Sequence, residues 1–494
     1  MAALLVASLA VFGAVHPSAY PPLWVCCGTL AALLAQRARL VEGLRRRIGG
    51  RRVTLHRGGL WAEVGGGPLA DGWSIDLERP ALARGPLLAP GLAFAGLVLI
   101  QLVPLPAGLG RLLAPRLAEP GGGFRPLTLS APDTLRGLAF VLSALALHTA
   151  AATVFASSGA RERFRRLVCG LGLALGLFAL AQMASGTQRI YGVFRPLEWQ
   201  GGATIFGPFV NRNHFGGYML MVAPLCLGAW AERVGRYRRR VGQRANLRRF
   251  LVGLQSPEGT AAVYTGISAL AATAALLAST SRGALAAGGL ALCVAAAAAP
   301  ARRRLAVALL PVALAGLALA WFGTDRLSAR FGLLRRLAPD RPIVWRDTLA
   351  RMQGLWLAGS GFNTFGSAMS RVSAWSLPEG ATPWSEPYET TVAHRPRAGY
   401  ASPPEIPWLT WYREAHNDYL QVLVETGVPG LLLALWAAGA ALWRARGDPW
   451  LLAAVAGVLL HALVDFDLQV PALALLFAAV AALAPGRRLE AGTR

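Results

Sequence analysis

The segment His416-Asn417-Asp418-Tyr419-Leu420-Gln421 places a histidine among groups that donate and accept protons, just before a long apolar run. If the segment is helical, Asp418, Gln421 and Glu425 occupy positions i, i+3 and i+7 of one face. A histidine in such surroundings can act as a general base near neutral pH. The same pattern fits a helix cap with a solvated polar face, so the segment alone leaves both interpretations open.

Two further polar clusters interrupt apolar runs, and each contains an arginine. They are Asn211-Arg212-Asn213-His214 and Ser279-Thr280-Ser281-Arg282-Gly283. A guanidinium stays charged, and its fork of donors can bind two phosphate oxygens at once. Singly, Arg212 and Arg282 could instead extend to a membrane interface, and His214 could be an interfacial histidine. Together the clusters predict an anion-binding site near a histidine base.

The rest of the chain indicates an all-α polytopic membrane protein. Of its 494 residues, 54% are hydrophobic and 15% charged, and the mean hydropathy is +0.44, unlike the balance of a soluble domain. The five cysteines lie in apolar runs without metal-ligand spacing, so we expect neither a disulfide framework nor a metal site there. Apolar segments predict about twelve transmembrane helices, near 1–15, 20–36, 87–103, 137–157, 167–186, 214–231, 261–279, 284–299, 305–322, 418–443, 449–465 and 471–484.

The positions of the arginines predict the orientation of these helices. All 49 basic residues are arginine. With the N-terminus in the cytoplasm, the cytoplasmic segments carry 30 arginines against 8 on the other side, apart from the long segment 323–417, whose length allows export regardless of charge. Both termini are therefore predicted inside and the three polar clusters outside. The arginine-rich stretches become membrane anchors near anionic lipid, so the net charge of +24 does not indicate nucleic-acid binding.

The predicted organisation has four parts. Residues 1–160 form N-terminal membrane helices with a cytoplasmic insert at 37–86, in which the alternation of Val53-Thr54-Leu55-His56 indicates a strand of a hairpin. Residues 161–322 form central membrane helices that carry both arginine clusters. Residues 323–417 form one large, partly helical periplasmic loop, and 418–494 form the C-terminal membrane helices. A loop of this length, rich in aromatic residues, is expected to be functional rather than disordered.

Residues 416–421, followed by Glu425 and Gly427-Val428-Pro429-Gly430, resemble the signature segment of the O-antigen ligase and polymerase superfamily. Residues 211–215 and Ser281-Arg282-Gly283 resemble two further signatures of that superfamily. Two more motifs follow in the same order: Trp345-Arg346 with Gly359-Ser360-Gly361-Phe362-Asn363-Thr364-Phe365, and His461 with Asp465-Phe466. The resemblance covers about residues 160–480. The insert 37–86 and the long stretch 370–412 depart from the pattern and leave the acceptor open.

The resemblance implies a metal-independent, cofactor-free glycosyltransferase of the bacterial inner membrane that serves lipopolysaccharide or exopolysaccharide synthesis. Its donor would be a glycan on undecaprenyl pyrophosphate, its acceptor a hydroxyl of a glycan or lipid, and its active site periplasmic. Arg212, Arg282 and Arg346 would then bind the pyrophosphate, and His416 would take the acceptor proton as the anomeric carbon is inverted. The other predicted substrate-binding residues are Asn211, Asn213, His214, Asn417, Asp418 and Gln421.

Three activities within the superfamily remain open on this pattern: a ligase, a chain polymerase and a protein O-glycosyltransferase share the motifs and differ in the acceptor. A lipid or polysaccharide transporter is the alternative from another class. Transporters are expected to carry ionisable residues near the middle of the membrane and internal repeats. The ionisable residues of this chain instead cluster at one predicted membrane face, which favours the transferase.

Overall fold

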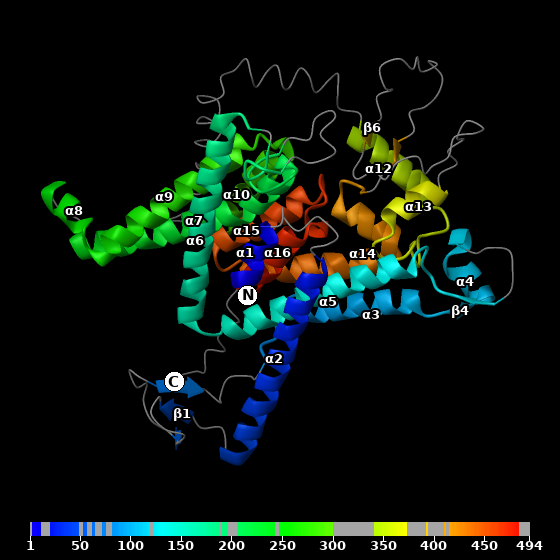
Figure 1. Cartoon of the computed structure of the whole chain (residues 1–494), viewed down its shortest axis with the longest axis horizontal. Coiled ribbons are helices and arrows are strands. Elements are labelled where there is room, and N and C mark those ends of the chain that lie inside the picture. The colour runs from blue at the N-terminus through cyan, green and yellow to red at the C-terminus, as the bar shows by residue number, and fades with distance from the viewer. Residues whose placement is uncertain are drawn as a thin grey trace.

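The structure, a computed structural model, is mostly helical, as predicted (Figure 1). It describes residues 2–10, 20–48, 53–56, 62–64, 72–75, 82–117, 123–187, 189–194, 205–242, 247–299, 340–372, 392–393, 410–411 and 414–483. The α-helices are α1 Ala2–Ala10, α2 Tyr20–Ile48, α3 Leu88–Leu102, α4 Ala107–Leu113, α5 Ala131–Val154, α6 Ser158–Ser185, α7 Arg212–Val241, α8 Leu247–Gly253, α9 Pro257–Ala278, α10 Arg282–Ala298, α12 Asp340–Arg351, α13 Phe365–Val372, α14 Asp418–Ala445, α15 Pro449–His461 and α16 Pro471–Ala482.

Five of the described helices, α5, α6, α7, α9 and α14, are long and apolar enough to cross a membrane. Four shorter apolar helices, α3, α10, α15 and α16, accompany them. These apolar helices indicate a multi-pass membrane protein. Each predicted span coincides with a helix except the one near 305–322, which lies outside the described residues. The count of about twelve crossings stays a prediction.

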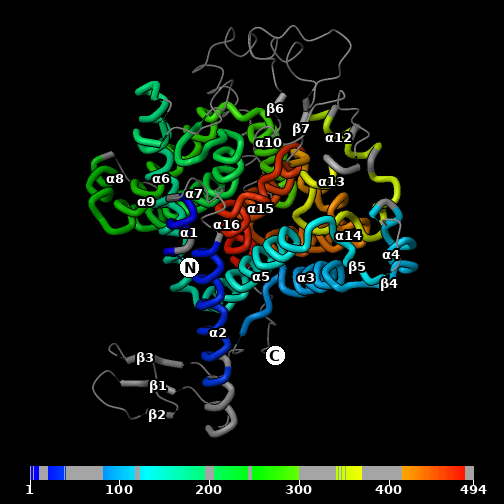
Figure 2. Tube along the Cα trace, turned by 45° about the vertical axis from the view of Figure 1, so that its right-hand side comes forward, coloured from blue at the N-terminus to red at the C-terminus, as the bar shows by residue number. Residues whose placement is uncertain are grey.

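The core of the bundle is formed around α15 and α16. Every residue of α16 is buried, and nearly every residue of α15, as expected for helices that are apolar on all sides. Helix α16 packs against α1, α5, α7 and α15, while α7 packs against α9 and α15. Figure 2 shows α15 and α16 near the middle of the molecule, with α3, α5 and α14 beside them. This packing brings the N-terminal end of α7 to the connection between α15 and α16.

Helix α14 is broken at Gly427, whose φ of 68° and ψ of −172° are not helical. The break frees carbonyl groups of the preceding turn. The Val424 carbonyl accepts the Ser360 N–H at 2.9 Å, and the Glu425 carbonyl accepts the Gly361 N–H at 3.0 Å. A Cβ at position 427 would lie 2.5 Å from the Leu357 carbonyl oxygen, so this site needs glycine for space as well as for its positive φ.

The side chain of Glu425 fastens the same loop from within the bundle. Its two carboxylate oxygens accept the backbone N–H groups of Asn363 at 2.9 Å and Phe365 at 3.0 Å. Gln101 of α3 adds hydrogen bonds to the Glu425 carbonyl and from the Phe362 N–H. The motif Gly359 to Phe365 is thus scaffolding that joins α13, α14 and α3.

The insert 37–86 differs from its prediction in two ways. Helix α2 continues to Ile48 instead of ending near residue 36, because most residues beyond the apolar run are Ala, Leu, Glu or Arg, which are good helix formers. The insert contains a three-stranded antiparallel sheet rather than a hairpin, with strand order β2-β1-β3. Strand β1, Val53–His56, is confirmed, and it pairs with β2, Ala62–Val64, and β3, Gly72–Ile75.

The remaining strands are two-residue antiparallel pairs. Strand β4, Leu105–Pro106, pairs with β5, Phe124–Arg125, and β6, Val392–Ala393, pairs with β7, Thr410–Trp411. Short 3₁₀ helices lie at Pro115–Leu117 and Asp467–Gln469. Within the described part of the segment 323–417, helices α12 and α13 confirm that the loop is partly helical.

Candidate active site

The structure brings the three predicted polar clusters together. Arg212, the first residue of α7, donates from Nη1 to Oγ1 of Thr280 at 3.4 Å, which joins the first two clusters. His214, in the first turn of α7, lies next to Asp465 in the connection between α15 and α16. His416, just before α14, contacts the same Asp465. A single carboxylate therefore links segments that are far apart in the sequence.

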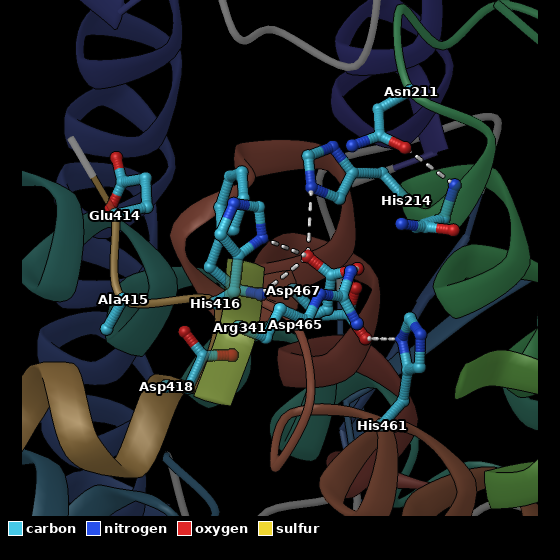
Figure 3. A network of polar contacts seen from close by, with 12 residues as sticks. Asn211, His214, Arg341, Glu414, Ala415, His416, Asp418, His461, Asp465 and Asp467 are labelled. Carbon is cyan, nitrogen blue, oxygen red and sulfur yellow. Dashed lines mark hydrogen bonds and ion pairs between the residues drawn. The ribbon is translucent and has the colours of Figure 1, made fainter. Parts of the chain in front are cut away.

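Asp465 is fully buried and lies at the centre of the site (Figure 3). Its Oδ1 lies 3.4 Å from Nδ1 of His416, and 3.8 Å from Nε2 of His214. The same oxygen accepts the Phe466 N–H at 3.1 Å. Its other oxygen, Oδ2, accepts a hydrogen bond from Nη2 of Arg341 at 2.9 Å. Asp465 thus contacts His416 and Arg341 by hydrogen bonds and lies next to His214 without one.

These contacts decide the charge of Asp465. Burial raises the pKa of its carboxyl group, but the hydrogen bond with His416 and the positive charge of Arg341 outweigh burial and hold the pKa well below its ordinary value. Asp465 is therefore ionised at physiological pH. An ionised carboxylate only accepts hydrogen bonds, so the hydrogen between Asp465 and His416 belongs to Nδ1 of the histidine. That tautomer leaves Nε2 of His416 as the nitrogen that can take a proton.

The backbone around His416 is held from two sides. The Ala415 N–H donates to Oε1 of Gln421 at 3.0 Å, and Nε1 of Trp345 in α12 donates to the Ala415 carbonyl at 3.0 Å. The His416 side chain is 14% exposed. Its ring packs edge-to-face on Phe466 with 5.0 Å between centroids, and His214 packs on Phe466 at 4.6 Å. Phe466 therefore contacts both histidines.

Two residues of the site have an unusual backbone conformation. His416 has a φ of 49° and Thr280 a φ of 53°. Residues with side chains rarely adopt this left-handed region, especially β-branched ones, and such strain costs about 1–3 kcal/mol. Strained backbone concentrates at functional sites. Its occurrence beside Arg212 and at His416 supports a functional role for both positions.

A second aspartate–histidine pair lies beneath the first. Oδ2 of Asp467 is 2.6 Å from Nδ1 of His461, and both side chains are fully buried. Burial raises the pKa of Asp467, although the neighbouring His461 opposes this shift. A Cβ at Gly217 of α7 would lie 2.5 Å from Asp467 Oδ1, and one at Gly283 of α10 would lie 3.0 Å from His461 Nε2. The two glycines let α7 and α10 approach this pair closely.

Four predicted site residues hold the backbone in place. Asn211 accepts the Asn213 N–H and caps α7, and Asn417 accepts the Leu420 N–H and caps α14. Oδ2 of Asp418 accepts the Leu468 N–H at 2.9 Å, which ties α14 to the chain after Asp467. Gln421 holds the residue before His416, as described above.

The predicted arginines occupy different positions. Arg212 is partly buried, whereas Arg282, the first residue of α10, is exposed. Arg346 is exposed on α12. Five residues separate it from Arg341, which corresponds to about 140° around a helix axis. Arg346 therefore points to another side of α12 than the arginine that contacts Asp465.

Sequence reasoning overlooked Arg341 and did not place Asp465, Asp467 and His461 among the site residues. Asp465 and Asp467 lie within three residues, between two apolar segments, where carboxylates are costly to bury. This cost was the available signal that they belong to a functional site. His461 and Asp465 entered only as a family motif. Arg341 had no such signal, because it lies within a stretch that contains several arginines. Its importance arises only from the fold, which places α12 against the connection between α15 and α16.

The described residues contain no group of three or more His, Cys, Asp or Glu side chains arranged to hold a metal ion. The Asp465 carboxylate is already paired with a guanidinium. The chemistry that the observed arrangement supports is proton transfer at His416, and the cationic residues Arg212 and Arg282 begin α7 and α10.

These features define a polytopic helical membrane protein with a buried acid–base pair beside two arginine-bearing helix N-termini. Residues 267–435 match the family model described as O-antigen ligase, and this segment includes Arg282, Arg341 and His416. This match supports the resemblance of the motifs to the O-antigen ligase and polymerase superfamily, and it is consistent with a glycosyltransferase-type activity. No curated protein matches the chain.

Proposed function

We propose that this protein is an O-antigen ligase-type glycosyltransferase of the bacterial inner membrane. It transfers a glycan from undecaprenyl pyrophosphate to an acceptor hydroxyl at the periplasmic face, with inversion of the anomeric carbon and without a metal ion. The observation that supports this most strongly is the contact between His416 and Asp465, because the carboxylate engages Nδ1 of the ring and leaves Nε2 to act as the base.

In this mechanism Nε2 of His416 takes the proton of the acceptor hydroxyl as its oxygen attacks the anomeric carbon. The bond from that carbon to the pyrophosphate oxygen breaks, and the leaving group departs with the electron pair. The imidazolium that forms at His416 is stabilised by the ionised Asp465, and Arg341 keeps that carboxylate ionised and oriented. General-base help of this kind is worth about 10²–10⁴-fold in rate.

The pyrophosphate binds at the N-terminal ends of α7 and α10. Arg212 and Arg282 are the first residues of these helices, so their guanidinium groups add to the positive ends of the helix dipoles. Both helices also have side-chain caps, Asn211 and Ser281, which fix the course of the chain there. Arg346 is exposed on another side of α12 than Arg341, and in this proposal it would meet the pyrophosphate from that side as a third contact. Charge that develops on the leaving group is thereby neutralised.

The acceptor distinguishes a ligase from a chain polymerase, which shares this site and is the alternative. The test supplies purified protein with an undecaprenyl-pyrophosphate-linked glycan and a lipid acceptor. A ligase adds one preformed glycan to the lipid acceptor. A polymerase builds a ladder of chains on the undecaprenyl carrier and needs no lipid acceptor. Absence of transfer both to the lipid acceptor and to a chain on the undecaprenyl carrier would contradict the proposed function.

A further inference from the structure

A charged cavity lies where the N-terminal end of α6 meets the second half of α7. It has a volume of about 390 Å³ and is partly open. Its charged side chains give a net charge of +3, because five are arginines and two are glutamates. They are Arg161, Glu162, Arg165, Arg166, Glu232, Arg233 and Arg236.

The glutamates arrange the arginines around the cavity. Glu162 accepts hydrogen bonds from Nε of Arg166 at 3.2 Å and from Arg233. Glu232 likewise accepts hydrogen bonds from Arg165 of α6 and Arg236 of α7. Each carboxylate accepts from two guanidinium groups, so positive charge remains in excess around the cavity.

The start of α6 adds to this positive potential. Ser158 and Gly159, the first residues of the helix, line the cavity. The preceding Ser157 makes no side-chain capping bond, and the first turn contains no acidic residue. Nη1 of Arg161 donates to the carbonyl of Phe155 at the end of α5, which holds this guanidinium at the cavity. A helix N-terminus surrounded by arginines favours an anion, and phosphate suits the fork of a guanidinium.

The position of the cavity along α7 shows what kind of phosphate it can meet. Arg233 follows His214 by nineteen residues, which is about 30 Å at the rise of an α-helix. This length matches the hydrocarbon core of a bilayer, about 30 Å. The cavity therefore lies at the opposite membrane face from His416. Trp230, 43% exposed and one turn before Arg233, is of the type that concentrates at the headgroup level.

We infer that this cavity binds the phosphate of an anionic membrane lipid, at the membrane face opposite the catalytic histidine. Charge, depth and the exposed tryptophan together favour a lipid over a soluble anion. The site is independent of the transfer reaction, and it anchors the end of α7 that lies farthest from Arg212 and His214.

The first test counts lipids bound to the purified full chain by native mass spectrometry, with phosphatidylglycerol or phosphatidylcholine added. We expect phosphatidylglycerol to bind preferentially, and the double variant Arg165→Gln, Arg236→Gln to bind it about 10- to 30-fold more weakly. The control is Arg238→Gln, Arg239→Gln, which removes the same charge from exposed positions of α7 outside the cavity. An equal loss of phosphatidylglycerol binding in both double variants would contradict a specific site in the cavity, because the loss would then follow from the net charge alone.

Two further measurements cover other outcomes. Inorganic phosphate should not displace phosphatidylglycerol from the wild-type protein. Displacement would assign the cavity to a soluble anion and would contradict the proposal that it binds a lipid.

If the cavity variant does not fold, phosphatidylglycerol with brominated acyl chains tests the wild type directly. Its bromines should quench Trp230, measured as the difference between wild type and Trp230→Phe, more than brominated phosphatidylcholine does. Equal quenching by the two lipids would contradict a phosphate-specific site.

Discussion

Nδ1 of His416 lies 3.4 Å from Oδ1 of Asp465, although 49 residues separate the two in the chain. This contact joins the end of the long loop to the connection between two buried helices. It explains why a histidine and a carboxylate that are costly to bury occur in apolar surroundings: the histidine donates a hydrogen bond, and the carboxylate accepts it.

Replacing Asp465 with Asn should remove most of the activity while preserving the shape of the site. An asparagine amide can donate a hydrogen bond to Nδ1 of His416, which would move the ring hydrogen to Nε2 and block the base. We expect transfer to fall about 10²–10⁴-fold with donor binding nearly unchanged. Single-turnover transfer and binding of the lipid-linked donor would be measured separately. Unchanged transfer would show that Asp465 does not orient the base.

Arg341→Gln should lower both stability and activity, because Asp465 loses its cationic partner. The folded pKa of Asp465 lies below its ordinary value, so its stabilising effect is present above the ordinary pKa and is lost only as pH falls through the folded value. The melting temperature of the variant should therefore lie below that of wild type by a constant amount between about pH 5 and pH 8.

The control for this variant is Arg136→Gln, which breaks an ion pair between Arg136 and Asp133. The Arg136 side chain is 57% exposed. Exposed pairs of this kind are worth about 0–1 kcal/mol, so this variant should melt close to wild type. Similar melting of the Arg341 and Arg136 variants would contradict a specific role for Arg341.

The fold was largely predictable from apolar patterning, since each predicted span in the described residues coincides with a helix. The site was only partly predictable. His416 and the arginine clusters stand out because they interrupt apolar runs. Asp465 and Arg341 acquire their roles through tertiary contacts of α12 and α15, which no local pattern encodes. Asn211 and Asn417, which the resemblance implies as substrate-binding residues, use their side-chain oxygens as helix caps, and their binding of substrate stays a prediction.

Arg212→Lys and Arg282→Lys should each cost much of the activity, although the charge is retained. A lysine ammonium is a point charge and cannot bind two phosphate oxygens in parallel as a guanidinium does. We expect weaker donor binding together with slower transfer. Insertion into the membrane should be normal, as judged by expression and melting. Near-wild-type transfer by both variants would mean that these arginines only extend to the membrane interface.

The predicted orientation can be tested by labelling cysteines in intact cells, on a background without the native cysteines. A cysteine at position 380 should react with an impermeant reagent, whereas cysteines at positions 60 and 245 should react only after lysis. The reason is the excess of arginine in the segments predicted to be cytoplasmic. External labelling at 245 would place all three polar clusters on the wrong side of the membrane.

The most direct test of His416 as the general base is the transfer rate of His416→Ala compared with wild type at several pH values. We predict a rate about 10²–10⁴-fold lower for the variant, with binding of the lipid-linked donor retained. We also predict a wild-type rate that rises with pH, since a base works in its neutral form. A wild-type rate that falls with pH would instead indicate an imidazolium that binds the pyrophosphate. Transfer by His416→Ala at the full wild-type rate would contradict the mechanism outright.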